Sequence, residues 1–320
     1  MLRKIALGLS VLVLALFIAG IAGYVITGPQ APAADSVSAQ WLKPGPYMTA
    51  SSDKVFVDSS RGTAANRDYS GAADRTLATT LWYPLDSEES HPLVIHSHGY
   101  IVAAADYPLT HGGAPGKPNA VDVVNQPADV SFLIDSVSAL SGPEKPFSGS
   151  IDASRIGLMG YSLGGLTTEL ATYHPTLRDP RVAAAASIAG PTTGFTADFF
   201  KTSDIPFLMI AGSLDYLINF EANAATIPNL VENGALVTIT GGTHLGFASV
   251  ADPMFRFMRH PDSLGCAAVL ANLDSDPNDS LNQLGGVAEG IVVDPTAPQV
   301  CEITQGVQYP TDESGDPVII

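Results

Sequence analysis

The sequence predicts an α/β fold in which helices cover both faces of a mostly parallel central sheet. Short apolar runs of strand length recur along the chain, and helical patterns separate several of them. The expected strands lie at 92–98, 100–107, 155–159, 181–188, 205–211 and 235–240, and the expected helices at 125–140 and 163–173. Residues 40–90 are expected to supply the first, antiparallel strands. A chain of 320 residues holds one such domain, which we place at 40–260, and an extension at 261–320.

A G-x-S-x-G motif stands at the junction of an expected strand and an expected helix. It runs from Gly160 to Gly164 around Ser162, and the apolar residues 155–159 precede it. At such a junction the motif forms a tight turn that presents a nucleophilic serine at the carboxyl end of the sheet, and flanking glycines avoid clashes. A glycine-rich turn with an incidental serine is the alternative, because Gly supplies 30 of the 320 residues.

A carboxylate follows the strand at 205–211, where the acid of a catalytic triad is expected. Asp215 is placed there, close enough to reach an imidazole without being part of the core. Asp204 and Glu221 are the competing acids nearby. Asp215 would otherwise be a solvated loop residue that caps a helix beginning near Tyr216. We take Asp215 as the candidate acid.

A histidine follows the strand at 235–240 on a glycine-containing loop. His244 on this loop can reach over the serine and accept its proton. The alternative is a surface loop histidine, but the other six histidines are less well placed along the chain. The order Ser162, Asp215, His244 is the order that a serine elbow of this kind requires.

Several short segments outside the elbow match a known family. They are Pro44-Gly45-Pro46-Tyr47, Val57-Asp58-Ser59-Ser60-Arg61, Arg75-Thr76-Leu77, Trp82-Tyr83-Pro84, His96-Ser97-His98-Gly99 and Thr243-His244-Leu245-Gly246-Phe247. With the elbow and Asp215, they resemble the α/β-hydrolase group of predicted dienelactone hydrolases, chlorophyllase-like proteins and platelet-activating-factor acetylhydrolase-like esterases. The resemblance spans about residues 44–260, most of the chain.

This resemblance implies the α/β-hydrolase fold and a serine hydrolase that cleaves carboxylic esters with small or otherwise accessible acyl groups. No cofactor is needed for that chemistry. The resemblance also implies an oxyanion hole with two backbone N–H donors. One belongs to Leu163, directly after the nucleophile, and the other to Tyr100, which follows a His-Gly pair.

The chain departs from the family pattern between the strands at 92–98 and 100–107, which only Gly99 separates. Two neighbouring parallel strands normally need a crossover of a dozen residues or more. The first crossover is therefore missing, and either the chain bends at Gly99 or the local topology has changed. If Tyr100 is held in a strand ladder, its N–H is not free, and losing one such donor typically lowers the rate about 100- to 1000-fold.

The pair His96 and His98 also suggests a metal site, because alternate strand residues point to the same face. A zinc site would need a third convergent ligand, and the sequence has no C-x-x-C or H-E-x-x-H motif. We expect no metal, and we expect these histidines to shape the loop above the serine.

The N-terminal residues 1–28 predict a signal peptide or a membrane anchor. Arg3 and Lys4 precede the uncharged, mostly apolar segment 5–26, which approaches the roughly 20 residues that span a bilayer. The small residues Ala31-Pro32-Ala33 favour a cleaved signal instead. In either case, basic residues on the amino side alone predict an exported catalytic part, secreted or attached to the cell envelope through 5–26.

The two cysteines, Cys266 and Cys301, both follow the candidate histidine. In an exported chain, a disulfide between them is the natural expectation, and it would stabilise the C-terminal extension by about 3 to 4 kcal/mol in the chain-entropy model. Two unpaired thiols are the alternative.

Three phenylalanines lie in the segment 191–204, which bridges two expected strands. Phe195, Phe199 and Phe200 either line an acyl pocket near the serine or close an edge of the core.

Composition restricts the remaining function classes. A net charge of -17 argues against nucleic acid as a partner and against charge-based binding to anionic lipid. A peptidase of this class would usually carry a substrate-selecting domain, for which the chain has no room. The stronger rival to an esterase is a catalytically silent envelope or binding protein, because the missing crossover lies next to the expected oxyanion hole.

Overall fold

A computed structural model describes most of the chain and divides it into two compact units. The described residues are 2–26, 33–36, 39, 47–85, 89–95, 101–141, 150–248, 261–270, 283–293, 296 and 300–301. One unit comprises Met1–Pro46 with Ser249–Met258, and the other comprises Tyr47–Ala248 with Arg259–Ile320.

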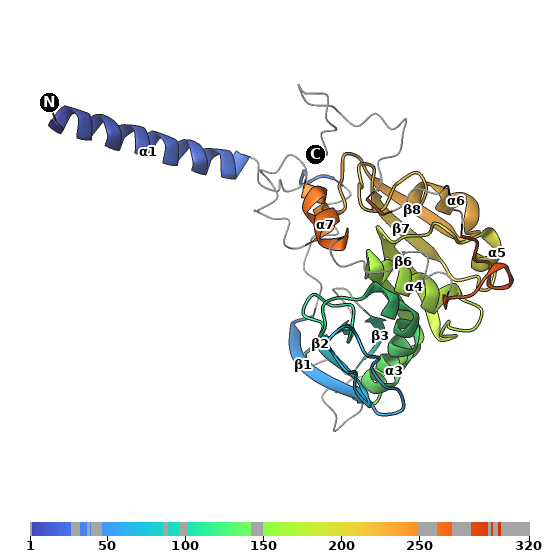
Figure 1. The fold of residues 1–320 in the computed structure, drawn as a ribbon. Helices are drawn as coiled ribbons and strands as arrows, with labels where there is room; N and C mark the ends of the chain where they lie inside the picture. Colours follow the sequence, from blue (N-terminus) through green and yellow to red (C-terminus); the bar gives the residue numbers. More distant parts are fainter. Residues whose placement is uncertain are drawn as a thin grey trace. The chain divides into compact units, whose positions relative to one another are not determined.

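The first unit contains one long helix, α1 (Leu2–Ile26), drawn in blue in Figure 1. Large apolar side chains from Leu12 to Val25 are exposed along it. Within the part of the chain that the structure describes, no helix combines the length and the apolar character that a membrane crossing needs.

The second unit is built on an eight-stranded sheet in the order β1-β2-β4-β3-β5-β6-β7-β8 (Figure 1). The strands are β1 (Thr49–Asp58), β2 (Arg75–Pro84), β3 (Ser90–Ile95), β4 (Ile101–Asp106), β5 (Ser150–Tyr161), β6 (Val182–Ile188), β7 (Phe207–Gly212) and β8 (Gly234–Ile239). Strand β2 pairs antiparallel with β1 and β4, and every other pairing is parallel. This confirms the predicted α/β fold with a mostly parallel sheet.

Helices and short helical turns lie between the strands and after the last strand, β8. They are η1 (Ala120–Asn125), α3 (Gln126–Ser138), α4 (Leu163–Tyr173), α5 (Ala197–Phe200), η2 (Ala224–Thr226), α6 (Ile227–Leu230), η3 (Leu245–Phe247), α7 (Pro261–Leu270) and η6 (Val287–Glu289). Helix α4 has the predicted bounds, and α3 lies within the predicted 125–140. Strand β5 is longer than the predicted 155–159, because its first half pairs with β3.

Strands β3 and β4 are parallel neighbours without a crossover helix. Leu93 pairs with Ile101 and Ile95 with Ala103, and the residues between the two strands, 96–100, lie outside the described part. Strand β3 begins two residues before the expected 92–98, and β4 lies within the expected 100–107; the remainder of the first prediction, 96–98, lies outside the described residues.

The missing crossover affects one face of the sheet. From β4 to β5 and from β5 to β6 the chain moves in the same direction across the sheet, so right-handed crossovers place α3 and α4 on the same face. The step from β3 to β4 runs the other way, and a right-handed crossover there would cover the opposite face. Among the described residues, side chains on that opposite face are less buried: Val94 and Met159 are only partly covered, and Val237 and Ile239 are 45% and 44% exposed.

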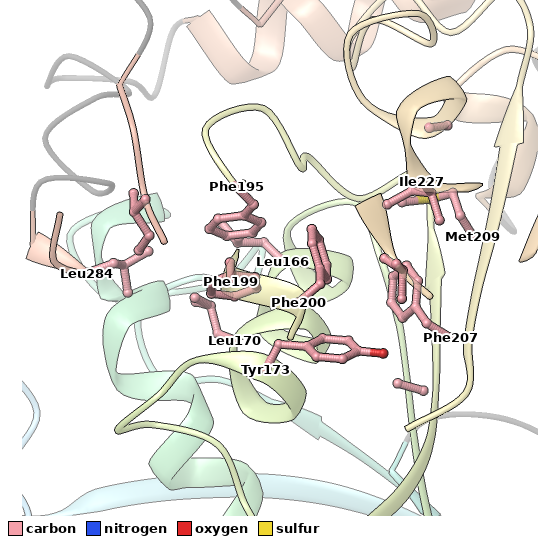
Figure 2. Close-up of a cluster of buried hydrophobic side chains, with 14 of the residues drawn as sticks. Leu166, Leu170, Tyr173, Phe195, Phe199, Phe200, Phe207, Met209, Ile227 and Leu284 are labelled. Atoms are coloured by element: carbon pink, nitrogen blue, oxygen red, sulfur yellow. The ribbon is translucent and has the colours of Figure 1, made fainter. Parts of the chain in front are cut away.

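The three phenylalanines expected near an acyl pocket or a core edge lie in the core. Phe195, Phe199 and Phe200 are at most 5% exposed and pack with Tyr173 of α4 and Phe207 of β7 (Figure 2). The rings of Phe195 and Phe199 stack with centroids 4.0 Å apart. Residues Leu284 and Ile291 of the C-terminal segment join the same cluster.

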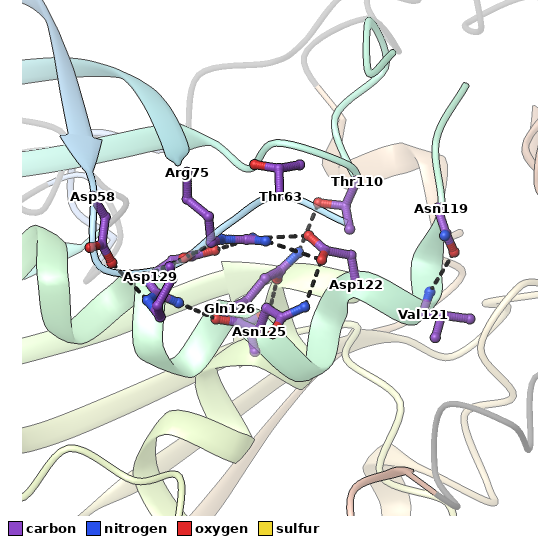
Figure 3. A network of polar contacts seen from close by, with 12 residues as sticks. Asp58, Thr63, Arg75, Thr110, Asn119, Val121, Asp122, Asn125, Gln126 and Asp129 are labelled. Carbon is purple, nitrogen blue, oxygen red and sulfur yellow. Dashed lines mark hydrogen bonds and ion pairs between the residues drawn. The ribbon is translucent and has the colours of Figure 1, made fainter. Parts of the chain in front are cut away.

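A buried ion network ties the antiparallel end of the sheet to α3. Arg75 at the start of β2 is 1% exposed, and its guanidinium donates to both carboxylate oxygens of Asp129 at 2.8 and 2.6 Å and to those of Asp122 at 3.2 and 2.9 Å (Figure 3). Arg61 adds a second ion pair to Asp129 at 2.7 Å. Burial raises the pKa of the Asp129 carboxyl, although the two arginines oppose this rise.

Replacing Arg75 should be strongly destabilising, because it leaves two buried carboxylates without their main partner. We expect Arg75→Met to lower the free energy of unfolding by about 3–5 kcal/mol, measured by urea denaturation. Arg155→Met is the matched control, since Arg155 forms a solvent-exposed pair with Asp152 and its loss should change the midpoint little. Equal effects of the two substitutions would contradict the importance of the buried network.

Candidate active site

The candidate nucleophile lies on a strained turn between β5 and α4. Ser162 has φ 55° and ψ −120°, a backbone conformation that a non-glycine residue adopts only when its surroundings impose it. Its N–H donates to the carbonyl of Ile188 on the neighbouring strand β6 at 2.8 Å. The turn therefore holds Ser162 at the carboxyl edge of the sheet.

The two glycines of the motif have different roles in this turn. A Cβ on Gly160 would lie 2.0 Å from the carbonyl oxygen of Gly164, so only glycine fits at Gly160. A Cβ on Gly164 would meet nothing within 4 Å. The expectation that flanking glycines avoid clashes therefore holds sterically for Gly160 alone of these two.

This difference gives a test within the motif. Gly160→Ala should open the turn and lower the free energy of unfolding by several kcal/mol, since backbone must shift to relieve the clash. Gly164→Ala should be neutral or slightly stabilising, because alanine favours helix over glycine. Thermal unfolding of the two variants measures the contrast, and a Gly160→Ala variant as stable as Gly164→Ala would show that the turn is looser than described.

The structure brings Ser162, Asp215 and His244 together from three loops. The Ser162 Oγ and His244 Nε2 atoms are 2.9 Å apart, and His244 Nδ1 lies 2.7 Å from Asp215 Oδ2. Asp215 and His244 are each 2% exposed. With Nδ1 protonated, His244 donates to the carboxylate and presents Nε2 as the acceptor for the serine hydroxyl.

Asp215 is held in a buried, hydrogen-bonded position rather than in solvent. Its second oxygen accepts the backbone N–H of Ile218 at 2.8 Å. Burial raises the pKa of the Asp215 carboxyl, and the hydrogen bond with His244 opposes that rise. Asp204 and Glu221 are both exposed, and of the three carboxylates only Asp215 is hydrogen-bonded to His244.

The loops that carry Asp215 and His244 are joined to each other directly. A Cβ on Gly212 would lie 2.1 Å from the carbonyl oxygen of Gly242, so the two loops approach at backbone distance. The same carbonyl accepts the N–H of Leu214 at 2.9 Å, and Ser213 Oγ accepts the N–H of Gly241 at 2.9 Å. The spacing between the candidate acid and base is therefore set by backbone contacts.

Of the two expected oxyanion donors, only one lies in the described part of the chain. Leu163 is the first residue of α4, where an N–H has no partner within its own helix. Tyr100 lies outside the described residues, as do His96 and His98, which were expected to shape the loop above the serine.

Two residues at the site were not singled out from the sequence. The hydroxyl of Tyr161 donates to the carbonyl of His244 at 2.9 Å, and the two rings lie 5.0 Å apart. Asp262 of α7 is fully buried and accepts backbone N–H groups from the loops of Asp215 and His244. Tyr161 lies within the G-x-S-x-G motif, which could have pointed to it. Asp262 has no sequence signal beyond its place in an acidic extension.

A buried carboxyl group also lies on α4, the helix that begins directly after Ser162. Glu169 on α4 is 0% exposed, and neither of its oxygens has a hydrogen-bond partner among the described residues. Burial raises the pKa of Glu169 well above its ordinary value, and the neighbouring Ser187 hydroxyl opposes this only in part. The folded protein therefore retains a proton on Glu169 at a pH at which the unfolded chain has lost it.

Stability should accordingly fall with rising pH, because the folded state binds more protons than the unfolded state above the unfolded pKa. We expect Glu169→Gln to remove this contribution, so that its thermal stability relative to wild type increases between pH 5 and pH 8. The gain at pH 8 should be at least about 1 kcal/mol, or about 2–4 °C in Tm for a domain of this size. The control is Glu221→Gln at an exposed position. A pH-independent difference between Glu169→Gln and wild type would contradict a protonated Glu169.

Comparison with known proteins adds a distant likeness. No family model matches the chain, and no curated protein matches it. Among solved structures, it is similar to a ferulic acid esterase from Streptomyces cinnamoneus, with 21% identity, a TM-score of 0.43, and coverage of 67% of this chain and 79% of that one. A likeness this distant carries no information on activity, so the site stands on this chain's own residues.

Proposed function

We propose that this protein is a serine hydrolase that cleaves carboxylic esters through an acyl-enzyme intermediate. The single observation that supports this most is the continuous hydrogen-bonded series from Ser162 through His244 to Asp215, with the serine on a strained strand-to-helix turn. Nucleophile, base and orienting acid within hydrogen-bond distance are the geometry that acyl transfer needs.

In this proposal each group has one role. Ser162 Oγ attacks the ester carbonyl carbon while its proton passes to His244 Nε2, and Asp215 holds the imidazole and stabilises its charged form. His244 then gives the proton to the leaving alkoxide, and the alcohol departs. A water molecule, deprotonated by His244, attacks the acyl-enzyme and releases the carboxylic acid and Ser162.

The tetrahedral intermediates carry a negative oxygen that needs donors. The N–H of Leu163, at the start of α4, would supply one, where the partial positive charge of the helix end also helps. Tyr100 is the second donor that the family resemblance implies. This donor would lie in the short connection between β3 and β4. The alternative function is a catalytically silent envelope or binding protein that has the same three side chains in contact.

The expected substrates are esters with short or otherwise accessible acyl groups, as the resemblance implies. Export remains a prediction from the N-terminal residues 1–28. The disulfide between Cys266 and Cys301 supports it, since such bonds persist in oxidising compartments.

The test is labelling of the full-length protein, kept in mild detergent, with a fluorophosphonate probe, followed by mass mapping. We expect modification at Ser162 and turnover of p-nitrophenyl acetate, both lost by at least about 1000-fold in Ser162→Ala. Ser154→Ala, at an exposed serine, is the control and should keep both. A folded protein without modification at Ser162 would overturn the proposal and leave the binding protein as the better account.

A further inference from the structure

Asp262 contacts both loops that carry the candidate acid and base. It is the second residue of α7 and is 0% exposed. Its Oδ2 accepts the N–H of His244 at 2.9 Å and that of Tyr216 at 3.1 Å, and its Oδ1 accepts the N–H of Leu245 at 2.9 Å. One carboxylate thus joins three backbone donors from two separate loops.

The position of these donors matters for the triad. Tyr216 directly follows Asp215, and the donor from the other loop is the N–H of His244 itself. An acidic residue in the first turn of a helix commonly interacts with the N–H groups of its own helix. The contacts of Asp262 instead run outward, to the loops after β7 and β8.

Helix α7 is itself fixed against the loop of Asp215. Cys266 on α7 is bonded to Cys301, and the N–H of Cys301 donates to the carbonyl of Leu217 at 3.0 Å. A Cβ on Gly265 would lie 3.1 Å from the Leu217 side chain and 3.4 Å from that of Leu245, so the helix packs closely on both loops.

We propose that Asp262 is a positioning residue that holds the loops of Asp215 and His244 at one fixed spacing, and that the Cys266–Cys301 disulfide holds Asp262 in place. This inference rests on the proposed function, because it concerns the same triad. It adds a role for the C-terminal segment: α7 completes the catalytic geometry without contacting substrate.

The chemistry of the three donors explains why a carboxylate is needed. All three backbone groups point N–H at Asp262, so every side-chain atom that faces them must be an acceptor. The amide of asparagine has one oxygen and one NH2 group, which places donor against donor at one side or the other. Asp262→Asn therefore separates at least one loop from the helix at nearly unchanged side-chain volume.

The first experiment measures steady-state kinetics with p-nitrophenyl acetate and the rate of fluorophosphonate labelling for Asp262→Asn and Asp262→Ala. We expect kcat and the labelling rate to fall about 10- to 100-fold, since a displacement near 1 Å of a catalytic group has this effect. KM should stay within about threefold, because Asp262 lies behind the triad.

Asp179→Asn is the matched control. Asp179 is also a buried aspartate that accepts backbone and arginine N–H groups, from Arg181, but it precedes β6 at the opposite edge of the sheet from Ser162. Its substitution should lower the Tm without changing kcat. An Asp262→Asn variant that folds and keeps the wild-type kcat and labelling rate would overturn the inference.

The disulfide provides a second, independent test. Cys266→Ser should lower kcat in the wild-type background but have little further effect in Asp262→Asn, because both changes release the same contact and their effects are then not additive. If the reductions in kcat from Cys266→Ser and Asp262→Asn were fully additive, the disulfide would not act through Asp262.

Hydrogen exchange separates failure of this inference from failure of the proposed function. The amides of Tyr216, His244 and Leu245 should exchange faster in Asp262→Asn than in wild type or in Asp179→Asn, whether or not the protein turns over an ester. If wild type is not labelled at Ser162 but these amides lose protection, the esterase proposal fails and the positioning role of Asp262 stands. Unchanged exchange at all three amides would overturn that role even in an active enzyme.

Discussion

One geometric constraint governs the second unit: three side chains from three different strand ends must meet within hydrogen-bond distance. Ser162 follows β5, Asp215 follows β7 and His244 follows β8, and the two contacts between them measure 2.9 and 2.7 Å. Parallel strands bring their carboxyl ends to one edge, which brings the three loops near each other. The distances between the three side chains are set further by backbone contacts between the loops and by the contacts of α7 with them.

The strained serine depends on structure far from the turn. A positive φ at Ser162 persists only if α4 cannot relax away from the sheet. Leu166, Leu170 and Tyr173 anchor this helix in the aromatic core, and Thr167 donates to Gln126 at the start of α3. Helix α3 is in turn bound to β2 by the buried ion network. The antiparallel end of the sheet thereby supports a turn that lies on its parallel half.

The sequence predicted what local patterns determine and missed what depends on tertiary contacts. The bounds of α4 and the order of Ser162, Asp215 and His244 follow from apolar periodicity, turn glycines and loop position, and the structure brings the three side chains together. Asp262 could not be found this way, because its role arises from N–H groups on loops that precede it by 17 residues or more. The phenylalanines at 195, 199 and 200 are equally ambiguous in sequence, since apolar aromatic residues suit a pocket and a core alike; here burial against α4 places them in the core.

The loss of one crossover is compatible with the hydrogen-bonded contacts among Ser162, His244 and Asp215, because the two concern different halves of the sheet. Strand β3 retains β5 as a parallel partner and β4 retains β2 as an antiparallel one, so each keeps its ladder hydrogen bonds despite the short connection. The loops of Ser162, Asp215 and His244 all belong to β5, β7 and β8, beyond the altered pair. The missing crossover therefore affects the partly uncovered face of the sheet and the connection that is expected to supply the second oxyanion donor. In a serine hydrolase the second oxyanion donor contributes to transition-state stabilisation, whereas the contacts among Ser162, His244 and Asp215 depend on the half of the sheet that has kept its crossovers.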